Sequence, residues 1–499
     1  MTEATASLGG VLKRGATMSA IGLVLAQVAT IIQTVVLGRI LGPVEVGVFT
    51  AGTVLIGFLV TFSQGGLAQA LIQRATDVED AAKTALVATF VTGLLSTLAV
   101  LAAAPLIGLV FHSPRVATIA AASSGLMVLY ALSSVPDALM QRAFQFKRQM
   151  IITPAVSFVL AGVSIVFAVL DYGAWSMVIG WYAAVLTAVV LSWWMAEWRP
   201  FGGRFSIRIW REMAGFSLPV LLDSIADRLR EVFEQAIVGR ALGAGDLGQF
   251  KYAFRIASLP TLALVTICSH VLFPAFSRIS DDSSRFRTAF LRALGWVWFA
   301  AAPAGVLMVA VGEPVVVLML GEQWRAAGHA TAAMAGIGLG VALSTVTAEA
   351  IKGAGRSALL NWSPALCLGL GVPLILLSVP FGLVGVGIAI SVTALAVGIV
   401  NLELARSLVG ATRREVCAHL VPTSVAAVVA LCALWPLENV LVRSDGYAEF
   451  TGLAFIAAEC VLFALIYLAV LRFIAPHYYF SLRDFCARRF TRMTQRGPR

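Results

Sequence analysis

Charge is scarce in this sequence. Lys, Arg, Asp and Glu make up 12% of its 499 residues and 59% of the residues are hydrophobic, whereas a soluble domain carries about 25% charged residues. Most of the chain must therefore lie in lipid. There the backbone N–H and C=O groups can all form hydrogen bonds only in helices or closed barrels. The apolar runs are continuous over roughly 20 residues, the length of a membrane-spanning helix, without the alternation of a barrel strand. The sequence therefore predicts an all-α polytopic membrane protein.

Patterns for enzyme chemistry and metal binding are missing as well. The six cysteines include no CxxC pair and the five histidines lack ligand spacing, so neither a disulfide framework nor a metal site is expected. The absence of GxxxxGKS and GxxxxGKT excludes an ATPase motor within the chain, and GxSxG and HExxH are also absent. The external connections expected below are short and lack paired acids. These absences argue against a catalytic site and favour transport.

The apolar runs predict fourteen membrane spans, of which the seventh is the weakest because charged residues crowd it. Their ranges are 16–37, 44–63, 84–110, 116–136, 151–170, 174–195, 213–238, 247–276, 289–311, 326–350, 359–379, 382–405, 417–436 and 450–471. The termini and the even-numbered connections hold 27 of the 36 Lys and Arg residues, against five in the odd-numbered connections. Basic residues favour the cytoplasmic side, so both termini are expected there. The net charge of +10 is then explained by basic residues that fix the orientation in the membrane and face anionic lipid headgroups. No nucleic-acid partner is expected.

A fourteen-residue pattern occurs twice, 201 residues apart. Residues 36–49 read VLGRILGPVEVGVF and residues 237–250 read IVGRALGAGDLGQF, and each copy ends one apolar segment and begins the next. A duplicated half is typical of transporters, in which two lobes enclose a site. The identical pairs are Gly38/Gly239, Arg39/Arg240, Leu41/Leu242, Gly42/Gly243, Gly47/Gly248 and Phe49/Phe250.

The spans and the repeat together predict the domain organisation. Two lobes of six spans each are expected, followed by two additional helices. The segments are a cytoplasmic N-terminus (1–15), an N-lobe (16–195), a cytoplasmic linker (196–212), a C-lobe (213–405), the additional helices (417–471) and a basic cytoplasmic tail (472–499).

Eight charged residues fall inside the seventh and eighth spans, where each costs about 2.5–3.5 kcal/mol on insertion scales. Two interpretations are open. The charges form ion pairs that only stabilise the helices, or they line a water-filled cavity in which bases bind an anionic substrate and acids carry a coupling ion or hold the bases. Apolar residues would pack at lower cost, which favours the cavity. The candidate substrate-binding bases are Arg228, Arg230, Lys251 and Arg255, and the candidate acids are Asp223, Asp227, Glu231 and Glu234.

The repeat offset aligns the charged span with a polar first span. Subtracting 201 places Arg228 on Gln27, Glu231 on Thr30 and Glu234 on Gln33. We therefore expect Gln27, Thr30 and Gln33 to line the same cavity. Polar side chains in a membrane helix also serve as hydrogen-bonding contacts between helices, and this alternative stays open.

The first third of the chain resembles the Wzx-type polysaccharide exporters of the multidrug/oligosaccharidyl-lipid/polysaccharide superfamily, in the branch of colanic-acid and succinoglycan exporters. In the second half, FPAFSR at 273–278 also resembles that branch, whereas Val46 replaces its usual aromatic residue. The segments that carry the resemblance in the first third are QTVVLGRILGP at 33–43, EVGVF at 45–49, GGL at 65–67 and ALIQR at 70–74.

The resemblance implies two six-helix lobes packed as a V, and a monomer that flips undecaprenyl-pyrophosphate-linked oligosaccharides across the bacterial inner membrane. It implies drive by a proton or sodium gradient without another cofactor. The implied partners are the lipid-linked oligosaccharide, membrane lipids, and a polymerase and chain-length regulator of the same pathway. The alternatives are a drug or metabolite antiporter of the MATE branch, a flippase for a peptidoglycan lipid precursor and, from another class, a membrane-embedded polymerase or glycosyltransferase.

Overall fold

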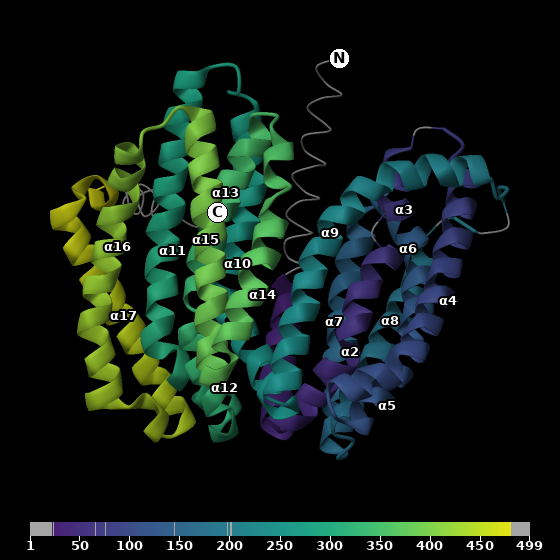
Figure 1. Ribbon diagram of the computed structural model, residues 1–499, viewed down its shortest axis with the longest axis horizontal. Helices are drawn as coiled ribbons and strands as arrows, with labels where there is room; N and C mark the ends of the chain where they lie inside the picture. Colours follow the sequence, from purple (N-terminus) through teal and green to yellow (C-terminus); the bar gives the residue numbers. More distant parts are fainter. Residues whose placement is uncertain are drawn as a thin grey trace, which may run out of the picture. The chain divides into compact units, whose positions relative to one another are not determined.

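The computed structural model describes residues 22, 24–64, 66–74, 76–143, 145–196, 198–199 and 202–480 (Figure 1). Every regular element in these ranges is helical, which confirms the predicted all-α class. The predicted cytoplasmic N-terminus and residues 481–499 of the predicted tail lie outside the described residues.

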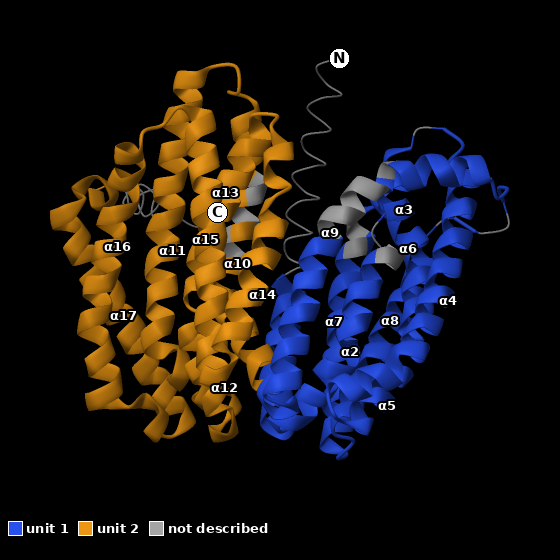
Figure 2. Cartoon of the chain, in the orientation of Figure 1, with its two compact units in different colours: residues 1–248 blue, residues 249–499 orange. Residues whose placement is uncertain are grey.

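The chain divides into two compact units, residues 1–248 and residues 249–499 (Figure 2). The boundary falls inside a helix, α10 (Ala244–Ser277), whose first turn belongs to unit 1. The other described helices of unit 1 are a helix over Val24–Ile40, α2 (Pro43–Gln64), α3 (Gly66–Gln73), α4 (Val78–Val110), α5 (Pro114–Ser123), α6 (Leu126–Arg142), α7 (Phe146–Val169), α8 (Ala174–Met195) and α9 (Ile207–Ala241).

Unit 2 holds the rest of α10 and a second set of helices. Its buried core lies mainly between α11, α13, α16 and α17, and α16 packs beside α11, where Trp298 Nε1 donates to Ser424 Oγ at 2.8 Å. The elements are α11 (Ser283–Leu320), η1 (Glu322–Trp324), α12 (Arg325–Ala333), α13 (Gly336–Gly353), η2 (Ser357–Leu360), α14 (Ser363–Ser378), η3 (Val379–Phe381), α15 (Gly382–Val409), α16 (Arg413–Pro436), η4 (Leu437–Val442), η5 (Ser444–Gly446) and α17 (Glu449–Ile474).

The predicted spans correspond to described helices or to pairs of consecutive helices. In the described part of the chain, nine helical stretches are long and apolar enough to cross a membrane, or ten if the bent pair Glu322–Ala333 and Gly336–Gly353 counts as one span. One of the nine, Ser357–Val409, contains two predicted spans, and the charged α9 is not among them. This number is consistent with fourteen spans and shows a multi-pass membrane protein.

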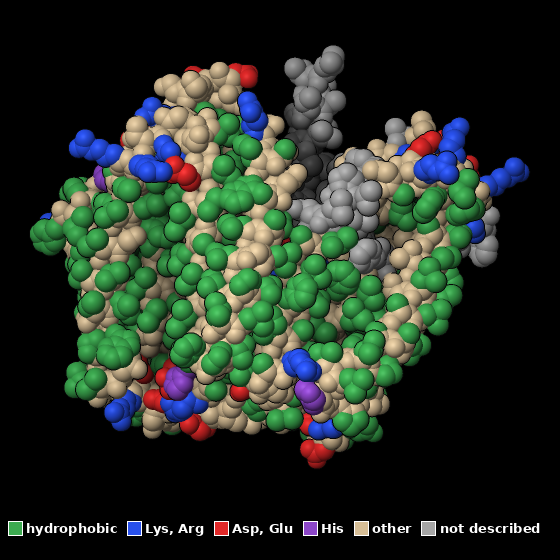
Figure 3. Space-filling model, viewed as in Figure 1, with side chains coloured by type: hydrophobic (Ala, Val, Ile, Leu, Met, Phe, Trp, Pro, Cys, Tyr) green, Lys and Arg blue, Asp and Glu red, His purple; other side chains and the backbone are tan. Residues whose placement is uncertain are grey.

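Apolar side chains cover the middle of the helices on the face seen in Figure 3, and charged side chains gather at helix ends. Leu106 and Leu109 of α4 and Leu465 of α17 expose more than half of their surface. In water such surfaces would aggregate, whereas lipid solvates them. The exposed apolar surface therefore agrees with burial in a bilayer.

Helix α9 lies in unit 1, whereas the predicted lobes assign its membrane span to the C-lobe. We expected its membrane span to begin the C-lobe at 213, but α9 packs on α2, α3 and α4 and so belongs to unit 1. Its Ile209 and Met213 are buried in a cluster with Leu71 of α3 and Val135 of α6. The first two turns of α9 thus have a buried apolar face. The sequence did not predict it, because charged residues dominate the rest of this helix.

The two copies of the repeat have the same local structure. One helix ends at Ile40 and the next begins at Pro43, and 201 residues later α9 ends at Ala241 and α10 begins at Ala244. The chain closes each first helix with equivalent bonds, from Leu41 N to the Leu37 carbonyl at 2.7 Å and from Leu242 N to the Val238 carbonyl at 2.9 Å. The copies differ at the break, because Gly243 alone of the two glycines adopts a left-handed φ of 93°.

The two copies also touch each other inside unit 1, through their glycines. A Cβ atom added to Gly47 would lie 1.6 Å from the carbonyl oxygen of Ala244, and one added to Gly248 would lie 2.0 Å from that of Pro43. These contacts are reciprocal, because Pro43 and Ala244 are themselves equivalent positions of the repeat. The starts of α2 and α10 therefore cross at a distance that only glycine allows.

Replacing either glycine of this crossing should destabilise the protein. For Gly47→Ala we expect a loss of about 1–3 kcal/mol, the usual cost of overpacking, because the new methyl group meets backbone that must shift. Gly57→Ala on the same helix is the matched control, since nothing lies within 4 Å of its added Cβ and alanine favours helix by up to about 1 kcal/mol. Thermal unfolding of the purified variants in detergent measures the difference. Equal melting temperatures of the two variants would contradict the close crossing.

Candidate functional site

The charged stretch of α9 is the part of unit 1 whose side chains are chemically best suited to bind a charged ligand. The helix begins after Ser206, whose hydroxyl accepts a hydrogen bond from the Ile209 N–H at 3.4 Å. Six charged residues then follow between 223 and 234. The side chain of Asp223 lies outside the described residues, and that of Asp227 is exposed.

The other four charges form two ion pairs along α9. Arg228 Nη1 lies 2.8 Å from Glu231 Oε2, and Arg230 Nη1 lies 2.5 Å from Glu234 Oε1. The side chain of Arg228 is 51% exposed, whereas that of Glu234 is 8% exposed. The pairs are local, because their members lie three and four residues apart on the same helix. The more exposed pair leaves guanidinium N–H groups accessible to an anion.

A glutamine extends this ladder toward the buried end. Gln235 Nε2 donates to Glu231 Oε1 at 3.0 Å, so Glu231 accepts from both Arg228 and Gln235. Glu231 and Glu234 therefore each contact an arginine of the same helix, and Glu231 also contacts Gln235.

The two bases of α10 lie in unit 2. Lys251 and Arg255 are half-buried and one helical turn apart, and Tyr252 between them packs edge-on against Trp324 with ring centroids 4.4 Å apart. Gln249 fixes the helix beside them, because its Nε2 donates to the Gln323 carbonyl at 2.7 Å and its Oε1 accepts from Ala327 N at 2.8 Å. The four predicted bases are thus divided between the two units.

The polar residues of the first span have three different environments. Gln33 is buried and its Nε2 lies 3.4 Å from Ser164 Oγ of α7, which is the interhelical contact that the sequence left open as an alternative. Thr30 donates to the Ala26 carbonyl of its own helix at 2.9 Å. Gln27 is exposed, so of the three it is the residue best placed to meet a ligand.

The repeat residues act as structural parts of unit 1. Arg240 donates to the Val110 carbonyl at 3.2 Å, and a Cβ on Gly239 would lie 2.3 Å from the ring of Phe111. Arg39 and Gly38 also make contacts of their own. Gly42 and Gly243 form the breaks between helices described above. These positions shape the helix ends rather than offer groups to a ligand.

An arginine of unit 2 binds together three segments outside the predicted spans. Arg325 lies 2.5 Å from both Glu322 and Glu313 and 2.7 Å from Asp445. The hydrogen bonds that Arg325 donates to Glu322, Asp445 and Glu313 raise the pKa of Arg325, and the bonds to Glu322 lower the pKa of that carboxyl group. The Arg325 cluster therefore stays charged and joins α11, η1 and the segment before α17.

Sequence reasoning missed a buried pair of carboxyl groups in unit 2. Glu438 accepts from Ser444 N at 2.9 Å and from Ser444 Oγ at 2.8 Å. Beside it, Glu459 of α17 is buried, and its two oxygens accept no hydrogen bond from the residues that the structure describes. The signal was present, because an acid inside a predicted span is costly and therefore informative.

Breaking the buried pair of α9 should destabilise the protein, and reversing it should restore stability. Glu234→Ala leaves Arg230 without its carboxylate in a membrane span, for which we expect a loss of about 1–3 kcal/mol, discounted from a fully buried pair because Arg230 is partly exposed. The double variant Arg230→Glu with Glu234→Arg keeps the pair and should recover most of that loss. The control is Arg208→Gln, which removes a 78% exposed partner of Glu212 and should change stability by less than about 1 kcal/mol. Thermal unfolding that shows no loss in Glu234→Ala would contradict the pair.

Known proteins share both the sequence pattern and the fold. A family model described as "Polysaccharide biosynthesis protein" matches residues 36–328. The lipopolysaccharide biosynthesis protein WzxC of Escherichia coli is 30% identical over 62% of this chain and 63% of its own length. The succinoglycan biosynthesis transport protein ExoT of Rhizobium meliloti is 24% identical over 66% of each chain. The matches thus span a little under two thirds of either relative.

Solved structures show the same fold at low sequence identity. The lipid II flippase MurJ in an inward closed conformation has a TM-score of 0.75 at 14% identity, over 93% of this chain and 99% of its own. An inward-facing multidrug resistance MATE family transporter of the MOP superfamily has a TM-score of 0.64 at 15% identity, over 79% of this chain and 98% of its own. The fold is therefore that of the MOP superfamily, as the resemblance implied. The family model matches more than half of the length of this chain, so the chain belongs to the polysaccharide biosynthesis protein family.

Proposed function

We propose that the protein is a flippase of the bacterial inner membrane. Its substrate is an undecaprenyl-pyrophosphate-linked oligosaccharide, the repeat unit of a surface polysaccharide such as an exopolysaccharide, a capsule or an O-antigen. Membership of the family supports this substrate class, as do relatives named for lipopolysaccharide biosynthesis and succinoglycan transport. A fold shared with a lipid II flippase supports action on a lipid-linked sugar.

The ion pairs within α9 carry the proposal. A pyrophosphate bears several negative charges and is recognised best by arginine, whose N–H groups form paired, charge-assisted hydrogen bonds. Arg228 is half-exposed and keeps donors beyond the one that binds Glu231. Glu231 and Glu234 neutralise the two arginines, so these ion pairs add no net charge to the membrane span. Lys251 and Arg255 provide a second candidate group for the pyrophosphate or for acidic sugars.

Alternating access driven by a proton or sodium gradient is the proposed mechanism, in antiport with the substrate. Asp223, Asp227, Glu231 and Glu234 are the candidates for carrying the coupling ion or for holding the arginines. We propose that both termini lie in the cytoplasm, where basic residues concentrate, and that the protein acts as a monomer. A polymerase and a chain-length regulator of the same pathway would use its product.

Deletion of the gene should leave the substrate on the cytoplasmic leaflet. We expect mass spectrometry of lipid extracts to show undecaprenyl-pyrophosphate carrying a complete repeat unit, together with loss of the surface polysaccharide and normal drug tolerance. The same strain with the gene restored is the control. Intact polysaccharide without lipid accumulation, joined to altered drug efflux, would instead favour the antiporter function of the MATE branch.

Removing single bases should stop export without removing the protein. For Arg230→Gln and Arg255→Gln we expect surface polysaccharide to fall at least tenfold, since loss of one charge-assisted hydrogen bond costs about 1.5–3 kcal/mol. Arg208→Gln removes an exposed arginine outside the predicted spans and should leave export unchanged. Polysaccharide is compared at equal amounts of membrane-inserted protein, measured by immunoblot. Full export from both variants would reject the cationic site.

A further inference from the structure

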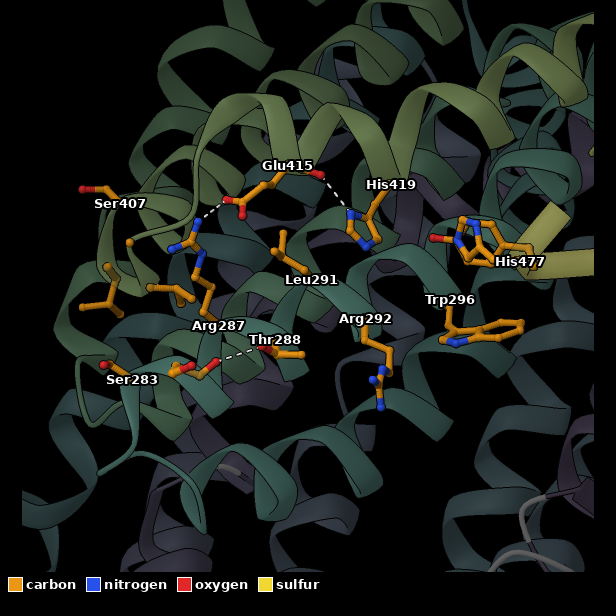
Figure 4. A pocket seen from close by; sticks show the side chains of 15 residues that line it. Ser283, Arg287, Thr288, Leu291, Arg292, Trp296, Ser407, Glu415, His419 and His477 are labelled. Carbon is orange, nitrogen blue, oxygen red and sulfur yellow. Dashed lines mark hydrogen bonds and ion pairs between the residues drawn. The ribbon is translucent and has the colours of Figure 1, made fainter. Parts of the chain in front are cut away.

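A large cavity opens in unit 2, and its lining includes none of the charged residues of α9 and α10 described above (Figure 4). Its volume is about 1170 Å³. Four parts of the chain line it: the first turns of α11, the end of α15, the start of α16 and the helical turn 476–480 that follows α17. All four adjoin connections that the distribution of basic residues assigns to the cytoplasmic side.

The lining of this cavity carries more positive than negative groups. Among the described residues that line it, Glu415 is the one acid, and it is already engaged, because Arg287 Nη2 lies 2.5 Å from Glu415 Oε2 and the Thr412 N–H donates to the same oxygen at 2.8 Å. These bonds, led by the one from Arg287, lower the pKa of Glu415 to about 2. Arg292 is exposed and has no ion-pair or hydrogen-bond partner among the residues that the structure describes. The positive charge of Arg292 is therefore uncompensated.

Two imidazoles add donors to the same cavity. His419 Nδ1 lies 2.8 Å from the Glu415 carbonyl oxygen, which can only accept, so Nδ1 carries a proton and Nε2 is left for another partner. Figure 4 shows His477 beside His419 and above Trp296. Burial, and after it the charge of the neighbouring His419, lowers the pKa of His477. An anion beside an imidazole favours its protonated form, in which both ring nitrogens donate.

A buried hydroxyl lies in the same wall without a partner. Tyr478 is 3% exposed, and within the described part of the chain its hydroxyl makes no hydrogen bond. A Cβ on Gly295 would lie 2.1 Å from Tyr478 Oη and 3.0 Å from His419 Cδ2, so the bare glycine lets the hydroxyl and the imidazole meet. Buried polar groups in native proteins are normally satisfied, and an orphaned one indicates a missing partner.

We propose that this cavity binds a phosphate-bearing anion, with Arg292, His477 and Tyr478 as hydrogen-bond donors and with His419 donating through Nε2 in its protonated form. The headgroup of an anionic membrane lipid and a soluble phosphate compound share the required chemistry. Trp296 packs edge-on against Tyr478 with centroids 5.4 Å apart, and a tryptophan in this position is typical of the membrane interface, where a lipid headgroup would lie. The site is separate from α9 and α10 and goes beyond the proposed transport function.

Binding to the purified full-length protein tests the site independently of transport. Native mass spectrometry from a neutral detergent counts bound phosphatidylglycerol, with phosphatidylcholine as the neutral comparison. The rise in melting temperature with pyrophosphate, against sodium chloride of equal ionic strength, tests a soluble ligand. We expect saturable binding of phosphatidylglycerol that is roughly tenfold weaker in Arg292→Gln, as for the loss of one charge-assisted hydrogen bond.

Arg285→Gln is the matched control, because Arg285 is exposed on the same helix but does not line the cavity. Its affinity should equal that of the unmodified protein. Stabilisation by pyrophosphate alone, lost in Arg292→Gln, would support the site and identify a soluble source. Equal affinities in Arg292→Gln and Arg285→Gln, or no binding of either ligand, would overturn the proposal.

Tyr478→Phe separates binding from folding. It removes the hydroxyl and keeps the ring, and since that hydroxyl has no partner within the described structure, the ligand-free protein should be as stable as before or more so. Its affinity for the anion should fall several-fold. Unchanged affinity would overturn the role of the hydroxyl as a donor.

Discussion

Lipid offers no hydrogen bonds, and the rest of this structure depends on that constraint. Polar side chains in the spans therefore find partners nearby. Thr89 donates to the Ala85 carbonyl and Thr347 to the Leu343 carbonyl, both at 2.8 Å and both one turn back on their own helix. The arginines of α9 follow the same rule with acids three and four residues away. Partners within one helix survive any movement of that helix, which suits the alternating access proposed above.

Much of the fold could be predicted from the sequence because hydrophobic length determines where membrane helices form. The predicted range 382–405 lies within α15, and the range 450–471 lies within α17. The repeat could be predicted down to its helix breaks, since the offset of 201 holds in the structure. The Arg230–Glu234 pair was also visible, because a spacing of four residues fixes which side chains meet on a helix.

Other features depend on tertiary contacts that no local pattern encodes. The packing of Ile209 and Met213 against α3 places α9 in unit 1, and charge in the same helix hid that apolar face. The carboxyl of Glu459 becomes notable only because Glu438 is folded back beside it. The cavity at the start of α11 joins residues more than 180 positions apart, Arg292 and Tyr478 among them. In the sequence its basic residues are indistinguishable from others that fix the orientation of the spans, and its aromatic residues are typical of a membrane interface.

The crossing of Gly47 and Gly248 has an evolutionary consequence. After the duplication, each copy of the motif became part of the surroundings of the other, since each glycine lies against the backbone that its counterpart's copy contributes. Neither copy could then drift alone, because a bulkier residue in one would have to be matched by a retreat in the other. A substitution at either glycine is therefore felt in both fourteen-residue segments at once.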